Sequence, residues 1–115
     1  MTDDEVEVRL YQTPDGNCPF EQWLDSLKDQ TTRMRVDARI ARIRCGNFGD
    51  AKPVGEGVHE LRLPFGSGYR VYYGREGSRV VILLTGGDKR RQAADIRLAK
   101  ALWQMYLREK PNANH

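Results

Sequence analysis

Two arginines and one tyrosine lie in stretches where apolar and polar residues alternate. In a β-strand, such alternation sends successive side chains to opposite faces. If Leu61 and Val71 face the core, Arg62, Arg70 and Tyr72 share the other face. Guanidinium groups stay charged and bind phosphate oxygens through paired hydrogen bonds. The pattern therefore predicts a rigid platform that binds a phosphate and stabilises charge that develops on it during a reaction.

Other cations lie in the segments that flank these strands. Lys52 belongs to segment 48–57, which is rich in glycine and is expected to form a loop. Lys89, Arg90 and Arg91 follow the last predicted strand. We expect both groups to converge at one edge of the sheet, where they would attract an anion.

An ordinary surface role is the competing interpretation of the two strand arginines. Arg62 and Arg70 could form only exposed ion pairs with Glu60 and Glu76, and such pairs are common and weak. From the residues alone, the two interpretations have about even odds. They differ in whether the cations meet in one accessible place.

Hydrophobic periodicity and turn residues predict the elements that must hold these side chains. The expected strands are 6–11, 58–63, 69–75 and 79–85, and the expected helices are 19–29, 31–45 and 91–108. The order β-α-α-β-β-β-α indicates one α+β domain over residues 1–115, with an antiparallel sheet, an N-terminal αα-hairpin and a C-terminal helix. Residues 111–115 are expected to fray.

Three finer expectations follow from the same patterns. Strand 6–11 is expected to place Val8 and Leu10 on its buried side. Thr31 or Thr32 is expected to cap the second helix. Segment 80–84 is apolar at every position, so its strand should be covered on both faces.

Charge is distributed unevenly along the chain. Residues 1–57 hold 8 Lys and Arg against 11 Asp and Glu, whereas residues 58–115 hold 11 against 5. A basic C-terminal half favours a polyanionic partner, most simply a nucleic acid, although surface charge for solubility would look similar.

Other classes of protein are disfavoured. The longest apolar run is too short for a membrane span, and segment 1–5 lacks the apolar core of a secretory signal, so we expect a cytoplasmic protein. Cys18 and Cys45 are then expected to be free thiols. No zinc-finger, P-loop or paired-aspartate motif is present, so no metal or cofactor is expected. His59 is expected to be a packed or edge histidine rather than a catalytic one.

Four motifs, in order and at family spacing, carry a resemblance to a known family: 55–63 (GEGVHELRL), 68–73 (GYRVYY), 83–89 (LLTGGDK), and Gln92 with Asp95 and Ile96 before Ala99. They resemble the HigB-like, addiction-module-killer branch of the RelE/ParE toxins, over residues 20–99. The chain departs from this pattern at Arg90 and Arg91, where relatives often carry small hydroxyl residues.

The resemblance implies the toxin of a type II toxin–antitoxin system. Such a toxin is a metal-independent endoribonuclease that cleaves mRNA on the ribosome and inhibits translation. Its expected partners are mRNA, the ribosome and a cognate helix-turn-helix antitoxin that is HigA-like, with which it could assemble into a heterotetramer.

The same resemblance suggests roles for the cations. Arg62 and Arg70 would stabilise the charged phosphorane formed when a ribose 2′-hydroxyl attacks the neighbouring phosphate. Lys52 or, preferably, Lys89 would be the base if desolvation and crowding by other cations lowered its pKa. Tyr72 would stack on a base or donate a proton.

Further residues are expected at the edge of this RNA site. Arg90, Arg91 and Gln92 are expected to contact RNA. Three arginines also recur at helical spacing, and they are Arg35, Arg39 and Arg42. A solvated helix face is their expected role, and contact with RNA, a partner or the ribosome is the alternative.

Two other functions remain open on the same residues. One scaffold can host unrelated activities, so a ParE-like inhibitor of DNA gyrase would have the same fold. A non-catalytic nucleic-acid-binding module, or a toxin that has lost its activity, would also fit the basic C-terminal half. The clustered cations favour the nuclease over the gyrase inhibitor by about 3 to 1.

Overall fold

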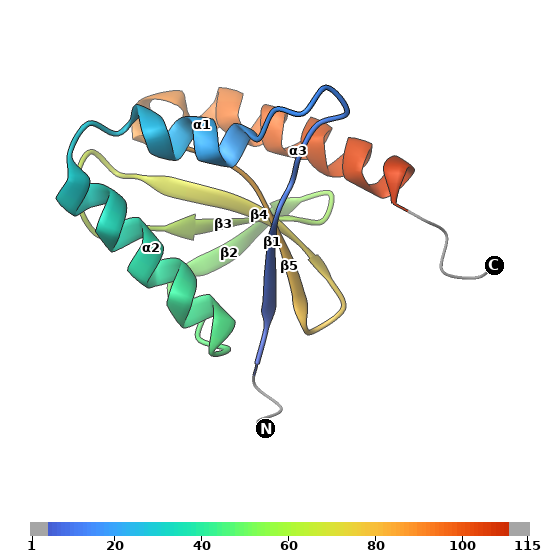
Figure 1. Cartoon of the computed structure of the whole chain (residues 1–115), viewed down its shortest axis with the longest axis horizontal. Coiled ribbons are helices and arrows are strands. Elements are labelled where there is room, and N and C mark those ends of the chain that lie inside the picture. The colour runs from blue at the N-terminus through green and yellow to red at the C-terminus, as the bar shows by residue number, and fades with distance from the viewer. Residues whose placement is uncertain (1–4, 111–115) are drawn as a thin grey trace.

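A five-stranded sheet with the order β1-β5-β4-β3-β2 forms the centre of the computed structural model, which describes residues 5–110 (Figure 1). The strands are β1 (Glu7–Leu10), β2 (Ala51–Gly55), β3 (Val58–Arg62), β4 (Arg70–Glu76) and β5 (Val80–Gly87). The helices are α1 (Pro19–Ser26), α2 (Gln30–Arg44), the short 3₁₀ helix η1 (Lys89–Arg91) and α3 (Gln92–Glu109). β1 runs parallel to β5, and all other neighbours are antiparallel. The predicted α+β class is confirmed, with one additional strand.

The additional strand, β2, occupies the segment that the sequence predicts to be a loop. It pairs antiparallel with β3 at the edge of the sheet. Pro53 has no backbone N–H to donate, and an edge strand tolerates this because one of its sides pairs with no other strand. Gly55, Glu56 and Gly57 all have positive φ and form the tight turn between the two strands. Lys52 is therefore held on a strand rather than on a loop.

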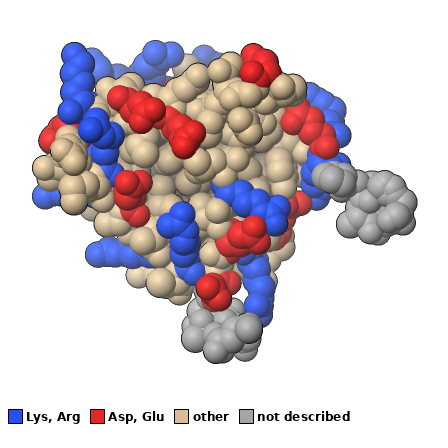
Figure 2. Space-filling model, viewed as in Figure 1, with Lys and Arg blue, Asp and Glu red and all other residues tan. Residues whose placement is uncertain are grey.

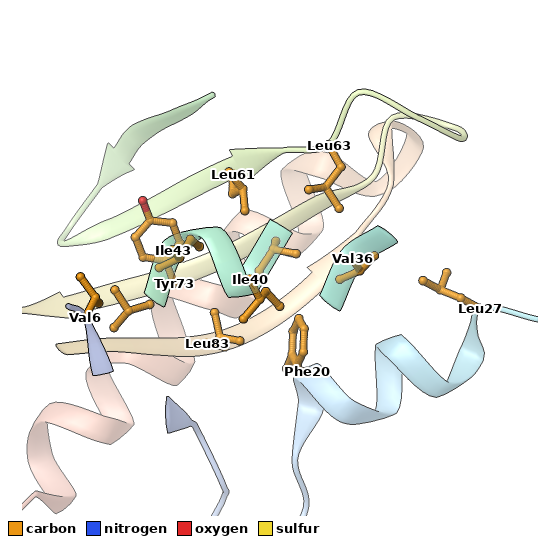
Figure 3. Close-up of a cluster of buried hydrophobic side chains, with 12 residues drawn as sticks. Val6, Phe20, Leu27, Val36, Ile40, Ile43, Leu61, Leu63, Tyr73 and Leu83 are labelled. Carbon is orange, nitrogen blue, oxygen red and sulfur yellow. The ribbon is translucent and has the colours of Figure 1, made fainter. Parts of the chain in front are cut away.

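Helices cover both faces of the sheet. α1 and α2 pack on one face through an apolar cluster that includes Ile43, Leu61 and Leu83 (Figure 3). α3 packs on the other face through Leu102 and Trp103. The apolar strand β5 contributes to both clusters, as its sequence predicts, and its residues from 81 to 84 are at most 1% exposed.

Two local expectations are wrong. Leu10 is 41% exposed, and Tyr11 is buried instead, because Tyr11 packs against Tyr106 of α3 and its hydroxyl donates to Glu109. The second helix is capped by Asp29, whose carboxylate accepts from the backbone N–H of Thr31. Asp29 is the cap instead of Thr31 or Thr32 because α2 begins at Gln30, before both threonines.

Other expectations concern the surface and the termini. Cys18 and Cys45 are free thiols. Within residues 5–110, no helix is long and apolar enough to cross a membrane. The expected fraying of 111–115 lies outside the described residues. On the face seen in Figure 2, Lys and Arg are spread around the rim with Asp and Glu among them, so this face carries no single basic patch.

Replacing Ile43 with alanine is expected to lower the free energy of unfolding by about 2–5 kcal/mol, because Ile43 is fully buried and the change leaves a cavity. Met34 lies on the same helix but is 63% exposed, so M34A should change it by less than about 0.5 kcal/mol. Urea denaturation of both variants measures the difference. Similar losses in the two would contradict the placement of α2 on the sheet.

Candidate phosphate-binding site

A buried carboxylate, Glu60 on β3, is the centre at which the predicted site residues meet. Its Oε2 atom lies 3.4 Å from Nε of Arg70 and accepts hydrogen bonds from the Tyr72 hydroxyl at 3.1 Å and from Nε2 of Gln92 at 2.8 Å. Its Oε1 atom lies 3.5 Å from Nε of Arg62. One carboxylate thus connects side chains from β3, β4 and the start of α3.

The strand register explains why these residues converge. Lys52 on β2 is opposite Glu60, and Glu60 is opposite Tyr72 on β4. In the next row, Arg62 is opposite Arg70. Residues directly opposite on one face have Cβ atoms about 4.5–5.5 Å apart. The predicted shared face of Arg62, Arg70 and Tyr72 is therefore confirmed.

The two arginines differ in their access to solvent. Arg70 is 8% exposed, and its Nη1 donates to the carbonyl oxygen of Gly68 at 2.8 Å. The Arg62 side chain is 43% exposed. Both lie in the wall of an open cleft of about 250 Å³, whose full lining is Arg39, Asp50, Arg62, Leu63, Pro64, Gly68, Tyr69 and Arg70. An anion in this cleft would contact arginines from two strands and from α2.

The charge balance at Glu60 differs from that of ordinary surface ion pairs. Arg62 and Arg70 share the one carboxylate of Glu60, and Asp50 also lines their cleft. Glu76, the other expected partner, instead binds Tyr106 and Lys110. A buried pair of this kind contributes little net stability, because desolvation offsets the attraction. Its role is better explained by the fixed position that it gives to the two guanidinium groups.

The lysines lie near this cluster but are exposed. Lys52 sits beside Glu60 in the register, and Lys89 lies next to Gly68, where an added Cβ would be 3.0 Å from the Lys89 Cβ. The expected role as base depended on desolvation and on crowding by other cations, and neither side chain is buried. Lysine side chains also supply hydrogen-bond donors to an anion.

Tyr72 does not have the role expected of it, and Gln92 binds the same carboxylate. The Tyr72 ring is 0% exposed beneath α3, so the predicted stacking on a base is wrong. Burial and the neighbouring Glu60 carboxylate raise the pKa of Tyr72, which makes the hydroxyl a fixed donor to Glu60 rather than an acid. Gln92, expected to contact RNA, also donates to Glu60. Both side chains hold the carboxylate in place.

Two of the remaining predicted cations lie outside the arginine cleft. Arg90 and Arg91 line a second pocket, together with α1, rather than the arginine cleft. The Arg90 Nη2 atom lies 3.3 Å from the Asp88 carboxylate. They therefore line a different hollow from the arginines around Glu60.

The helix arginines also separate. Arg39 lines the cleft with Arg62. Arg35 lies over the Phe65 ring, with 5.4 Å from its Cζ to the ring centroid, and Arg42 is exposed. Only Arg39 of the three therefore lines the described cleft.

Two carboxylates that the sequence reasoning missed are buried here. The sequence analysis treats Glu60 only as a surface partner of the arginines. Its strand alternation with the apolar Val58 and with Arg62 places all three on one face, and this pattern was the available signal. Asp95 in the first turn of α3 is 8% exposed, and its Oδ2 atom has no hydrogen-bond partner among the described residues. Burial raises the pKa of Asp95, and the Arg91 charge partly opposes this.

His59 has no direct part in the site. Its ring stacks on Tyr73 at a centroid distance of 5.3 Å, which confirms the expected packed histidine. Burial and the nearby Arg75 lower its pKa. Within residues 5–110, no three His, Cys, Asp or Glu side chains are grouped so that they could hold a metal ion.

Comparison with known proteins identifies one close similarity. The chain is 48% identical over 85 residues to a protein of Haemophilus influenzae that is named "Uncharacterized protein". The match covers 74% of this chain and 86% of that protein. No protein-family model matches the chain.

Replacing Glu60 with alanine is expected to lower the free energy of unfolding by about 3–5 kcal/mol, because it leaves the buried Arg70 charge unpaired. E60Q should lower the free energy of unfolding by less, since the amide oxygen can still accept a hydrogen bond from the Tyr72 hydroxyl. Glu7 pairs with Arg9 at the exposed edge, so E7A is the control and should not change the denaturation midpoint. An E60A variant as stable as E7A would show that the cluster is not formed.

Proposed function

We propose that this chain, which belongs to the same family as the Haemophilus influenzae protein, is a type II toxin that cleaves mRNA without a metal ion. The observation that carries the proposal is the pair Arg62 and Arg70, held by one buried carboxylate in the wall of an open cleft. Guanidinium pairs fixed in this way suit a phosphate diester. The sequence resemblance to HigB-like toxins adds RNA as the substrate and the ribosome as the place of cleavage.

The chemistry needs only the RNA, the chain and solvent water. The ribose 2′-oxygen attacks the adjacent phosphorus, water takes up the 2′-proton, and the bond to the 5′-oxygen breaks as that oxygen takes a proton from water. The products are a 2′,3′-cyclic phosphate and a 5′-hydroxyl. Arg62 and Arg70 stabilise the additional negative charge on the phosphorane oxygens, which is an electrostatic role fixed before the substrate arrives.

The other residues act through these two arginines or through charge. Glu60 is fully buried, so it is a positioning residue that holds both guanidinium groups, with Tyr72 and Gln92 fixing it in turn. Lys52 and Lys89 raise the positive potential beside the cleft, which favours binding of the RNA backbone. The proposal also includes a helix-turn-helix antitoxin as the neutralising partner in the cytoplasm.

Replacing Arg62 or Arg70 with alanine is expected to lower the rate of mRNA cleavage about 10²- to 10³-fold, as for loss of one oxyanion donor in other enzymes. The assay is cleavage of a ribosome-bound mRNA, with the RNA ends identified by mass spectrometry. Arg97 is exposed on α3, so R97A is the matched control and should retain the rate.

Three results would contradict the proposal. They are full cleavage by both arginine variants, RNA ends other than cyclic phosphate and 5′-hydroxyl, and no cleavage by the wild type. In the last case, a loss of DNA supercoiling by gyrase in the same cells would favour the gyrase-inhibitor alternative. Thermal unfolding of each variant shows that a lower rate does not come from misfolding.

A further inference from the structure

A second pocket lies beside the arginine cleft, between α1, the end of β5 and the start of α3. Its volume is about 390 Å³, and its full lining is Trp23, Ser26, Leu27, Ser67, Tyr69, Gly86, Gly87, Asp88, Arg90, Arg91 and Asp95. Tyr69 lines both this pocket and the arginine cleft. Arg70 of the cleft is the register partner of Gly87 of the pocket. The two hollows are therefore neighbours, with adjacent strands and Tyr69 between them.

The pocket combines three kinds of group. Trp23 and Tyr69 contribute aromatic rings, with centroids 6.1 Å apart and planes at 70°. Asp95 contributes a carboxylate that is more than nine-tenths buried, with an Oδ2 atom that has no hydrogen-bond partner among the described residues. Arg90 and Arg91 contribute exposed guanidinium groups, and Arg90 Nη2 also lies 3.3 Å from the Asp88 carboxylate of the same lining. These groups suit a ligand that is flat, that donates hydrogen bonds at one end and that is anionic at the other.

Two glycines allow the side chains of this pocket to pack directly against the β5 backbone. A Cβ at Gly86 would lie 2.3 Å from the Trp23 ring, and a Cβ at Gly87 would lie 1.8 Å from Oδ2 of Asp95. The carboxylate oxygen thus lies directly against bare backbone. An unpaired buried oxygen is unfavourable, and a hydrogen-bond donor in the pocket would relieve it after a small rotation of the carboxylate.

We infer that this pocket binds the guanine base of the RNA nucleotide next to the cleaved phosphate, with Asp95 as the residue that selects it. This inference rests on the proposed ribonuclease function. The pairing edge of guanine presents two adjacent N–H donors, which match the two oxygens of a carboxylate. Uracil presents there a single N–H between two carbonyl oxygens, so it can donate to one carboxylate oxygen only, and its own oxygens are repelled by an ionised carboxylate. Trp23 or Tyr69 contacts the ring, and Arg90 and Arg91 bind the attached phosphate.

Binding of guanosine 3′-monophosphate and uridine 3′-monophosphate to the intact chain tests the pocket without RNA cleavage. The wild type is expected to bind the guanosine nucleotide at least about tenfold more tightly. The indole N–H signal of Trp23 and the amide signal of Gly87 should shift in NMR spectra. D95N, which replaces an acceptor with a donor, should lose the preference, whereas D37N on the exposed face of α2 should keep it.

D95N is expected to fold. Because burial raises the pKa of Asp95, its ionised form is less favourable in the folded chain than in the unfolded chain at neutral pH, so an amide there should not destabilise. Melting curves check this. If D95N does not fold, the wild-type preference and the shifts at Trp23 and Gly87 still decide the matter.

The outcomes separate this inference from the function on which it rests. Equal affinities for the two nucleotides, shifts only at residues outside the pocket, or a D95N variant with the wild-type preference would each overturn the guanine site, whatever the cleavage assay gives. Guanosine selection by a protein that cleaves no mRNA would support the pocket and overturn the ribonuclease. Selection together with cleavage next to guanosine, lost in D95N, would support both.

Discussion

The attraction between the buried Glu60 carboxylate and two guanidinium groups is the interaction on which the rest of the site depends. Two cations on neighbouring strands repel each other, and the shared carboxylate removes most of that repulsion. Because desolvation offsets its stabilising effect, this cluster is better understood as a device for position than for stability. The fold surrounds it with donors from Tyr72 and Gln92, so the carboxylate has little freedom to move.

The architecture produces this arrangement through a division between the two faces of the sheet. One face is closed by α1 and α2 and is apolar throughout its central part. The other is closed by α3 only in part, so the row that contains Arg62 and Arg70 emerges at the rim beside the β3–β4 turn. Burial of Glu60 in the neighbouring row and exposure of Arg62 at the rim give a fixed carboxylate and an accessible guanidinium group 3.5 Å apart.

The sequence predicts the parts of the site that depend on strand periodicity. Arg62, Arg70 and Tyr72 were assigned to one face because side chains alternate with period two, and the register confirms it. Strand periodicity does not predict the contacts that form when helices pack on the sheet. Burial of Tyr72 beneath α3 and the place of Arg39 in the cleft result from tertiary packing. The edge strand with Lys52 was missed because glycine and proline in its short sequence indicate a loop.

Side-chain NMR tests most directly whether arginines from separate strands form one phosphate site. An RNA hexamer with a 2′-O-methyl group at each position cannot be cleaved by attack of the 2′-oxygen but keeps its phosphates. On titration, the Nε–Hε signals of Arg62 and Arg70 should shift together with a single dissociation constant, and E60Q should weaken that binding. Independent shifts with different dissociation constants, or shifts confined to arginines of the outer face such as Arg97, would contradict the account.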